Sequence, residues 1–335
     1  MTLTATAIAH PNIAFIKYWG NRDDMIRLPS NGSISMNLEA LYTRTTVTFS
    51  RDFRRDVIRI NGKKADPNTE FRIEDWLDDL LCYVYHKNLV DKKLAMEGPG
   101  KVEIISENSF PTGAGIASSA SAFAALTLAT FGALGIEPDE ADLSYWARRG
   151  SGSACRSIPE GFCEWDRGSG THDSYAYSLA PASHWDLVDL ITVISTKHKK
   201  VGSSKGHRSA DTSPFQSERV RTAPERIAKC RNAILEKDFT ALAEVSEQDM
   251  IMMHSVMMTQ DPPLFYWEPL TIRVIKAVRD WRESGLDCFA TVDAGPNVHV
   301  ICTSEAADEV RSRLEKIKGI RGILSSGPGG KAKLL

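Results

Sequence analysis

The chain has 335 residues, of which 42% are hydrophobic and 25% charged, and its net charge is −2. This length exceeds the usual size of one hydrophobic core, so we expect two lobes, and the charge gives no general attraction to nucleic acid or anionic membranes. No apolar stretch approaches the ~20 residues of a membrane span. The start lacks a secretory signal, and the six cysteines are scattered without metal-ligand spacing. These features predict a cytoplasmic protein with reduced thiols.

The first half of the chain alternates between strand-like and helix-like patterns. Period-two alternation predicts strands, and apolar residues at helical spacing predict helices. In chain order, the expected elements are an apolar strand over 13–19, a hairpin of strands 42–49 and 56–60 with its loop at 51–55, a helix over 71–86, a strand over 102–106 and a small-residue helix over 118–134.

The second half begins after a Gly- and Ser-rich loop at 168–174. We place a lobe boundary before the strongly apolar strand 187–195, which gives lobes 1–184 and 185–335. The expected elements that follow are helices over 217–236, 240–252 and 269–284, a strand pair at 289–292 and 298–302, and a last helix over 305–318. Because strands and helices mix without regular βαβ alternation, the pattern predicts an α+β fold and disfavours a doubly wound sheet.

The Gly-rich segment 108–125 has the outline of a phosphate-binding loop. A strand leads into a turn containing Pro111, Gly113 and Gly115, and a helix begins near Ser118. Small residues let the backbone approach a phosphate closely, and the helix N-terminus adds favourable charge. It is not a Walker A loop, because no Gly-Lys-Ser/Thr follows. The alternative interpretation of this segment is a closely packed helix start with a serine N-cap.

Two further segments place charged residues among glycine and serine. Residues 148–157, RRGSGSACRS, contain three arginines, which bind carboxylates or phosphates in a bidentate way. Residues 291–297, TVDAGPN, place Asp293 at the end of a strand, where it is available as a base or to orient a hydroxyl. A solvated loop and an ordinary turn are the respective alternatives.

A lysine interrupts the apolar segment near the start. Lys17 lies within residues 13–19, where a charge is costly unless it is paired or reaches an open site. The alternative is a side chain that extends along the protein surface to solvent.

Together these motifs resemble the mevalonate diphosphate decarboxylases of the galactokinase, homoserine kinase, mevalonate kinase and phosphomevalonate kinase superfamily. The resemblance covers nearly the whole chain. It rests on PNIAFIKYWG, NSFPTGAGIASSAS, ARRGSGSACRS with GFCEW, GSSKGHRSADTSP and TVDAGPN. It implies a two-lobed α+β small-molecule-kinase fold with the active site in the cleft between the lobes, usually in a homodimer. It also implies an enzyme of isoprenoid synthesis that uses ATP and magnesium.

The resemblance also assigns roles to residues. It implies that Asp293 contacts the C3 hydroxyl of a phosphorylated mevalonate, that Lys17 neutralises phosphate charge, and that Arg156 holds the substrate carboxylate. Ser151 and Ser153 are expected beside that carboxylate. The implied nucleotide-binding residues are Asn108, near the base, and Pro111, Gly113, Ala114, Gly115, Ser118 and Ser119, of which Ser118 or Ser119 lies near magnesium and the terminal phosphates; Ser119 is our choice of metal ligand.

The chain departs from the family where the far phosphate should bind. The family motif continues Lys-Tyr-Trp-Gly-Lys, and its second lysine, with the tyrosine, contacts the substrate diphosphate, whereas here Tyr18 is followed by Trp, Gly and Asn21. Losing a charge-assisted hydrogen bond costs ~1.5–3 kcal/mol. The usual Gly-Met-Arg also reads Gly-His207-Arg208, which leaves Arg208 and Arg72 as phosphate contacts.

We therefore hypothesise that the substrate is 5-phosphomevalonate and the product isopentenyl phosphate. If Arg22 or Lys205 supplies the missing charge, the substrate is the diphosphate and the product isopentenyl diphosphate. A mevalonate 3-kinase would use the same loop and stop at the phosphate ester. A nucleotide-binding regulator without turnover is disfavoured, because Lys17, Arg156 and Asp293 occur together.

Overall fold

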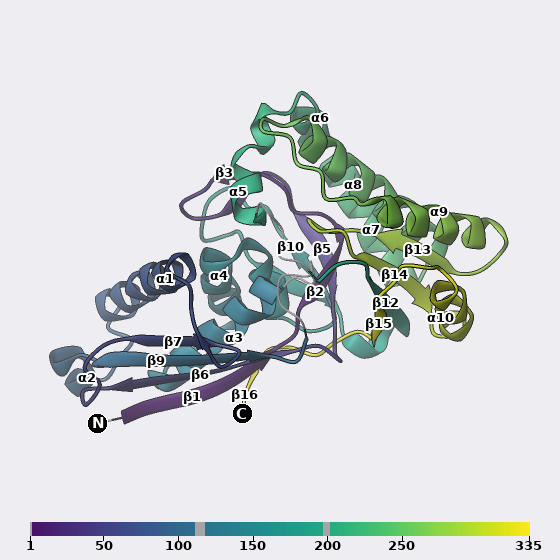
Figure 1. Ribbon diagram of the computed structural model, residues 1–335. Helices are drawn as coiled ribbons and strands as arrows, with labels where there is room; N and C mark the ends of the chain where they lie inside the picture. The colour runs from purple at the N-terminus through teal and green to yellow at the C-terminus, as the bar shows by residue number, and fades with distance from the viewer. Residues whose placement is uncertain (1, 111–117, 197–201) are drawn as a thin grey trace.

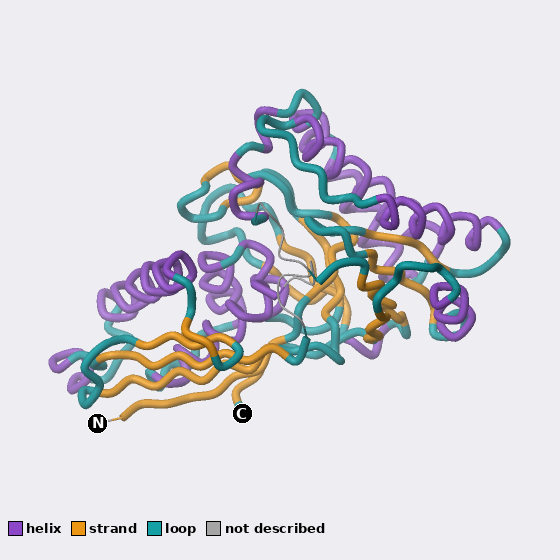
Figure 2. Tube along the Cα trace, in the orientation of Figure 1, coloured by secondary structure: helices purple, strands orange, loops and turns teal. Residues whose placement is uncertain are grey.

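The computed structural model describes residues 2–110, 118–196 and 202–335. Figures 1 and 2 show one group of elements with a long twisted sheet near the two chain ends and another in which helices α6 to α10 cover a second set of strands. Helices and strands are mixed, as the α+β prediction requires. No helix in these ranges is long and apolar enough to cross a membrane. All six cysteines are free.

The first sheet has six strands in the order β16-β1-β6-β9-β7-β8. Their bounds are β1 Thr2–Ala9, β6 Thr43–Ser50, β7 Val57–Ile60, β8 Lys63–Lys64, β9 Lys101–Asn108 and β16 Lys333–Leu334. The predicted hairpin of β6 and β7 is wrong, because β9 lies between them and runs parallel to β7. β6 forms eight residue pairs with β9, from Thr43–Asn108 to Ser50–Lys101. β7 has only four residues, so it could offer β6 fewer pairs than β9 does.

Helices cover one face of this sheet. They are α1 Pro67–His86, α2 Lys92–Glu97, α3 Ser118–Ala133 and α4 Glu140–Gly150. α3 is rich in alanine and serine, so it packs closely against the sheet, and most of its residues are buried. Asp66 caps α1 by accepting hydrogen bonds from the amides of Asn68 and Thr69, which starts this helix four residues before the predicted position.

The second sheet has the order β11-β10-β5-β2 and lies at the centre of the molecule. Its strands are β2 Asn12–Ile16, β5 Ser33–Asn37, β10 Phe162–Trp165 and β11 Ala176–Ala180, and the short strands β3 Asn21–Asp23 and β4 Leu28–Pro29 form a separate pair. Every residue of β2 and β5 is buried. The strand expected over 13–19 ends at Ile16, so Lys17 lies one residue beyond it.

The third sheet has the order β13-β14-β12-β15. Its strands are β12 Leu187–Val193, β13 Cys288–Thr291, β14 Val298–Thr303 and β15 Gly322–Ser326. The predicted pairing of β13 with β14 is confirmed. The helices of this part are α5 Ser203–Arg208, α6 Gln216–Arg221, α7 Ala223–Glu236, α8 Phe239–Thr259, α9 Pro269–Glu283 and α10 Ala307–Glu315.

Two helices of this part differ most from their predicted bounds. The helix expected over 217–236 divides into α6 and α7 at Thr222, because Pro224 has no amide hydrogen to continue the first helix. α8 continues seven residues beyond the predicted end, where Met253, Val256 and Met257 remain buried. The last strand, β16, returns to pair with β1. A lobe boundary near residue 185 stays a prediction.

Candidate active site

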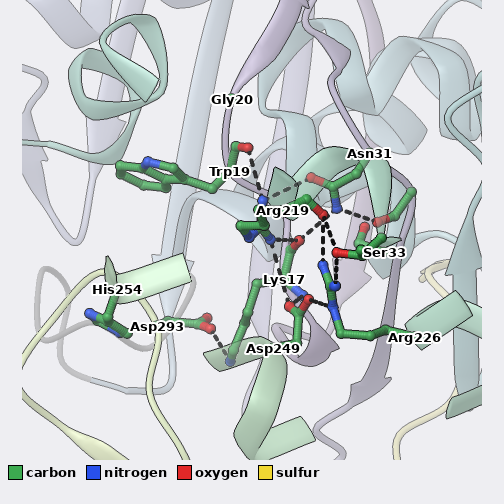
Figure 3. A network of polar contacts seen from close by, with 12 residues as sticks. Lys17, Trp19, Gly20, Asn31, Ser33, Arg219, Arg226, Asp249, His254 and Asp293 are labelled. Carbon is green, nitrogen blue, oxygen red and sulfur yellow. Dashed lines mark hydrogen bonds and ion pairs between the residues drawn. The ribbon is translucent and has the colours of Figure 1, made fainter. Parts of the chain in front are cut away.

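Lys17 and Asp293 form an ion pair between two parts of the chain far apart in sequence (Figure 3). The Nζ–Oδ1 distance is 2.6 Å, and the side chains are 1% and 26% exposed, respectively. Burial alone would raise the pKa of Asp293, but Lys17, with smaller contributions from His299 and Arg156, lowers it below its usual value. The carboxylate is therefore ionised at neutral pH and remains partly open to solvent.

The two side chains meet because each follows the end of a strand. Lys17 comes directly after β2, and Asp293 comes two residues after β13, in the bend that leads to β14. The amide of Gly295 donates to the Asp293 carbonyl oxygen at 2.7 Å, which tightens this bend. Residues 291–297 therefore form a turn, and the same turn directs the Asp293 carboxylate toward Lys17. The Lys17 side chain does not extend along the surface to solvent, and its buried ammonium is paired with a carboxylate.

Arg156 lies in the 3-10 helix Gly152–Ser157 and is 3% exposed. Its guanidinium donates to the hydroxyls of Ser33 and Ser35 on β5 and to the side-chain Oδ1 of Asn12 on β2. No carboxylate of the described residues forms an ion pair with it. A buried guanidinium held only by neutral groups keeps its charge available for an anion, and two of its five N–H donors are left over.

The serines of the site come together at the ends of two helices. The Ser151 hydroxyl, at the C-cap of α4, donates to the Ser119 hydroxyl at 3.2 Å, and Ser119 is exposed in the first turn of α3. Ser118 is the first residue of α3. Ser153 lies in the same 3-10 helix as Arg156, and its carbonyl accepts a hydrogen bond from Asn12 at 3.1 Å. The structure thus joins the α3 start to the Arg156 loop.

Asn108 is the last residue of β9 and the first residue of the Gly-rich segment 108–125. Its side-chain oxygen accepts from the Thr43 hydroxyl at 2.6 Å, and this hydroxyl also contacts Ser121 of α3. The predicted nucleotide contacts Pro111, Gly113, Ala114 and Gly115 lie outside the described residues.

Two residues of the predicted far-phosphate site, Tyr18 and His207, form a stack with Trp19. Tyr18 and His207 lie face to face with ring centroids 4.1 Å apart, and Trp19 is 4.4 Å from the same imidazole. His207 Nδ1 accepts a hydrogen bond from the Gly20 amide at 3.0 Å. Gly20 has φ of +92°, a conformation that disfavours other residues. The Tyr18 hydroxyl donates to Asn21, whose amide donates to Asp24 at 2.7 Å.

Arginines gather beside this stack. Arg72 of α1 donates to the Gly150 carbonyl, and Arg27 donates from Nε to the neighbouring Arg149 carbonyl at 3.0 Å. Burial, and then Arg27, lowers the pKa of Arg72 to about 9. Burial lowers the pKa of Arg27, and Arg208, an exposed residue at the end of α5, lowers it further. These neighbouring cations repel one another, and a bound anion would relieve that repulsion.

Arg22 does not join these cations. Its guanidinium donates to the carbonyls of Pro29, Arg167, Gly168 and Ser169. It therefore holds a loop and does not replace the lysine that is absent at position 21.

Several residues that face the site were not found from the sequence. Arg27 carries charge but stands in no motif, and Asn12, Ser33 and Ser35 lie in buried strands. Asn12 belongs to the PNIAFIKYWG segment, and its polar side chain in an apolar strand was the available signal. The described residues contain no cluster of three or more His, Cys, Asp or Glu side chains placed to hold a metal ion.

Comparison with known proteins gives matches to both halves of the chain. Family models match residues 9–176, as a diphosphomevalonate decarboxylase-like N-terminal domain, and residues 189–323, as a mevalonate 5-diphosphate decarboxylase C-terminal domain. The diphosphomevalonate decarboxylase of Candida albicans is 37% identical over 322 residues, covering 93% of this chain and 88% of the relative. The chain belongs to the diphosphomevalonate decarboxylase family. The human diphosphomevalonate decarboxylase is 38% identical, covering 91% of this chain and 78% of its own.

Solved structures of the diphosphomevalonate decarboxylase family share the whole fold. The mevalonate diphosphate decarboxylase of Staphylococcus aureus matches with a TM-score of 0.89 at 35% identity, covering 100% of this chain and 98% of that one. The complex named MDDEF with MVAPP, AMPPCP and magnesium matches with a TM-score of 0.89 at 34% identity, covering 100% and 99%. The superfamily fold predicted from the motifs is confirmed.

Proposed function

We propose that this protein uses ATP to phosphorylate the C3 hydroxyl of 5-diphosphomevalonate and then decarboxylates it to isopentenyl diphosphate, ADP, phosphate and carbon dioxide. The observation that carries the proposal is the pairing of Lys17 with Asp293 beside Arg156, a buried cation without a carboxylate partner among the described residues. The names of the relatives supply the diphosphate.

In the first step, the C3 oxygen attacks the γ-phosphorus of ATP while the bond to the bridging oxygen breaks and ADP leaves. Asp293 accepts the hydrogen bond of the attacking hydroxyl and Lys17 neutralises charge on the transferred group. Because the pKa of Asp293 is lowered, its carboxylate is a weak base. Its main contribution is to orient the hydroxyl, and it accepts the hydroxyl proton late, as the P–O bond forms and makes that proton strongly acidic.

In the second step, the tertiary phosphate leaves with its electron pair. The bond to the substrate carboxylate then breaks, its electrons form the C=C bond, and carbon dioxide departs. Arg156 holds the carboxylate through its remaining N–H donors. The neutral partners of Arg156 keep it in place without competing for the substrate carboxylate.

Magnesium and the ATP phosphates fit the start of α3. This helix has 16 residues and no acidic side chain in its first turn, so its N-terminus can meet anionic oxygens without repulsion. Ser119, which is exposed there, would be the protein ligand, with the phosphates as the others. When bound, magnesium supplies charge neutralisation for the phosphates.

The far phosphate would lie against Tyr18, Arg27, Arg72 and Arg208. With Arg27 present, the cluster holds three cations in spite of Asn21. One observation favours a second candidate, 5-phosphomevalonate giving isopentenyl phosphate: Asn21 is neutral, and its partner Asp24 adds a negative charge at the same edge.

Purified protein incubated with ATP, magnesium and each substrate in turn tests the proposal. We expect carbon dioxide release and a higher kcat/KM for the diphosphate. A higher value for the monophosphate would establish the second candidate. ADP without carbon dioxide would indicate a 3-kinase, and no turnover would reject an enzymatic role. We also propose a homodimer, which sedimentation velocity tests.

A further inference from the structure

The backbone on either side of Lys17 is held by buried charged side chains. β2 is an edge strand and ends at Ile16, so sheet neighbours do not satisfy the peptide groups that follow it. The Lys17 amide donates to Asp249 Oδ2 at 2.6 Å, and the Lys17 carbonyl accepts from Arg219 at 2.7 Å and Asn31 at 3.0 Å. Figure 3 shows these contacts converging on one residue.

Asp249 is the centre of this arrangement. It is fully buried in α8, and its second oxygen accepts from Arg226 Nε at 2.7 Å, while Arg219 lies 3.6 Å from the first. Arg219 also donates to Asn31 Oδ1 at 2.9 Å. Buried ion pairs seldom stabilise a fold more than apolar packing would. What this one supplies is a fixed direction for both peptide groups of Lys17.

The other member of the catalytic pair is held from the same helix. His254 of α8 is 1% exposed, and its Nε2 lies 3.2 Å from the Val292 carbonyl, which belongs to the peptide bond before Asp293. A carbonyl can only accept, so Nε2 carries the hydrogen. Trp267 packs against the ring at 4.6 Å. Burial lowers the pKa of His254 to about 3, so it is neutral at physiological pH.

Asp249 and His254 are five positions apart on one helix. A helix rises 1.5 Å per residue, so about 7.5 Å separates them along its axis. We infer that α8 positions Lys17 and Asp293 relative to each other, with Asp249 fixing the lysine backbone and His254 fixing the peptide before the aspartate. Neither residue touches the reacting atoms, so both are positioning residues. The inference rests on the proposed roles of Lys17 and Asp293 in phosphoryl transfer.

We therefore expect the pKa of Asp293 to depend on the position of Lys17. Asp293 faces Lys17, Arg156, His299 and the neutral His254. If the lysine moves away, burial raises the pKa of Asp293, so the acidic limb of the kcat profile moves to higher pH. A residue that only stabilises the fold would lower the melting temperature without moving this limb.

Two variants and two matched controls test the inference. Asp249→Asn keeps one acceptor but loses the charge, and His254→Met removes the donor to Val292. Glu164→Gln alters another buried carboxylate, which pairs with Arg231 at 2.6 Å, and His184→Met alters another imidazole bonded to a carbonyl, that of Ile234 at 2.9 Å. kcat, KM for ATP, melting temperature and the pH profile are measured for these four and for His254→Gln, on the whole chain.

We expect kcat to fall about 10- to 100-fold in Asp249→Asn and His254→Met, the range of a misplaced reacting group, with the KM for ATP nearly unchanged and the acidic limb at higher pH. The controls should keep kcat. His254→Gln, which restores an N–H donor, should recover most of the activity.

Unchanged kcat in folded Asp249→Asn and His254→Met would overturn the inference, as would an equal loss in the controls. If Asp249→Asn does not fold, His254→Met and His254→Gln decide. Wild-type turnover in the same assay tests the proposed function separately.

Discussion

The two ends of the candidate site are built differently. At the carboxylate end, Lys17 and Arg156 are 1% and 3% exposed, and strands or helices fix each of them from several sides. At the far-phosphate end, Asn21 and Asp24 lie on the β3–β4 pair and its turn, and Arg208 is exposed on the short helix α5. The first end has little freedom, so it is suited to chemistry. At the far-phosphate end, a change of charge would destabilise the fold little, so this end is suited to substrate selection.

The largest effect is expected at the carboxylate end, from Asp293→Asn. The amide can still contact the hydroxyl but cannot neutralise Lys17, so kcat should fall about 10²- to 10⁴-fold. Nucleotide binding, measured by calorimetry, should be retained. A variant with wild-type kcat would remove Asp293 from the mechanism.

Arg156→Lys tests whether geometry matters as well as charge there. Lysine cannot satisfy Ser33, Ser35 and Asn12 together and also bind a carboxylate. Losing one charge-assisted bond predicts a decrease of about 10- to 150-fold in kcat/KM. Steady-state kinetics measures it, and equal activity would show that a point charge is sufficient.

At the far-phosphate end, Arg27→Gln should separate the two substrates. The diphosphate should lose about 10- to 150-fold in kcat/KM, the value of one charge-assisted bond, and the monophosphate less. Arg22→Gln is the matched control, because that guanidinium binds loop carbonyls. The same loss in both variants would exclude a specific role for Arg27.

The smallest effect is expected from Asn21→Lys. An added cation should favour the diphosphate over the monophosphate, but an exposed pair is worth at most ~1 kcal/mol, about a fivefold ratio. Asp24 would also compete for the lysine. The ratio of kcat/KM for the two substrates measures the change, and a shift toward the monophosphate would contradict a phosphate contact at position 21.

The comparison also explains which parts of the site were predictable. Lys17, Arg156 and Asp293 stand in distinctive motifs, because polar residues among apolar or glycine-rich neighbours are visible in one dimension. Arg27, Asp249 and His254 stand in ordinary amphipathic or loop sequence. Only their neighbours in space distinguish them.

The amino-acid sequence by itself determined the α+β class and the positions of most helices. It also singled out Lys17, Arg156 and Asp293 as site residues. Tertiary structure alone decided that β9 separates β6 from β7, that the strand before Lys17 ends at Ile16, and that α8 holds both members of the pair. The physical reason is that local patterns record burial and backbone preference along the chain. Strand order and the partners of buried charges depend on contacts between residues distant in the chain, from 38 positions for His254 and Val292 to 232 for Lys17 and Asp249.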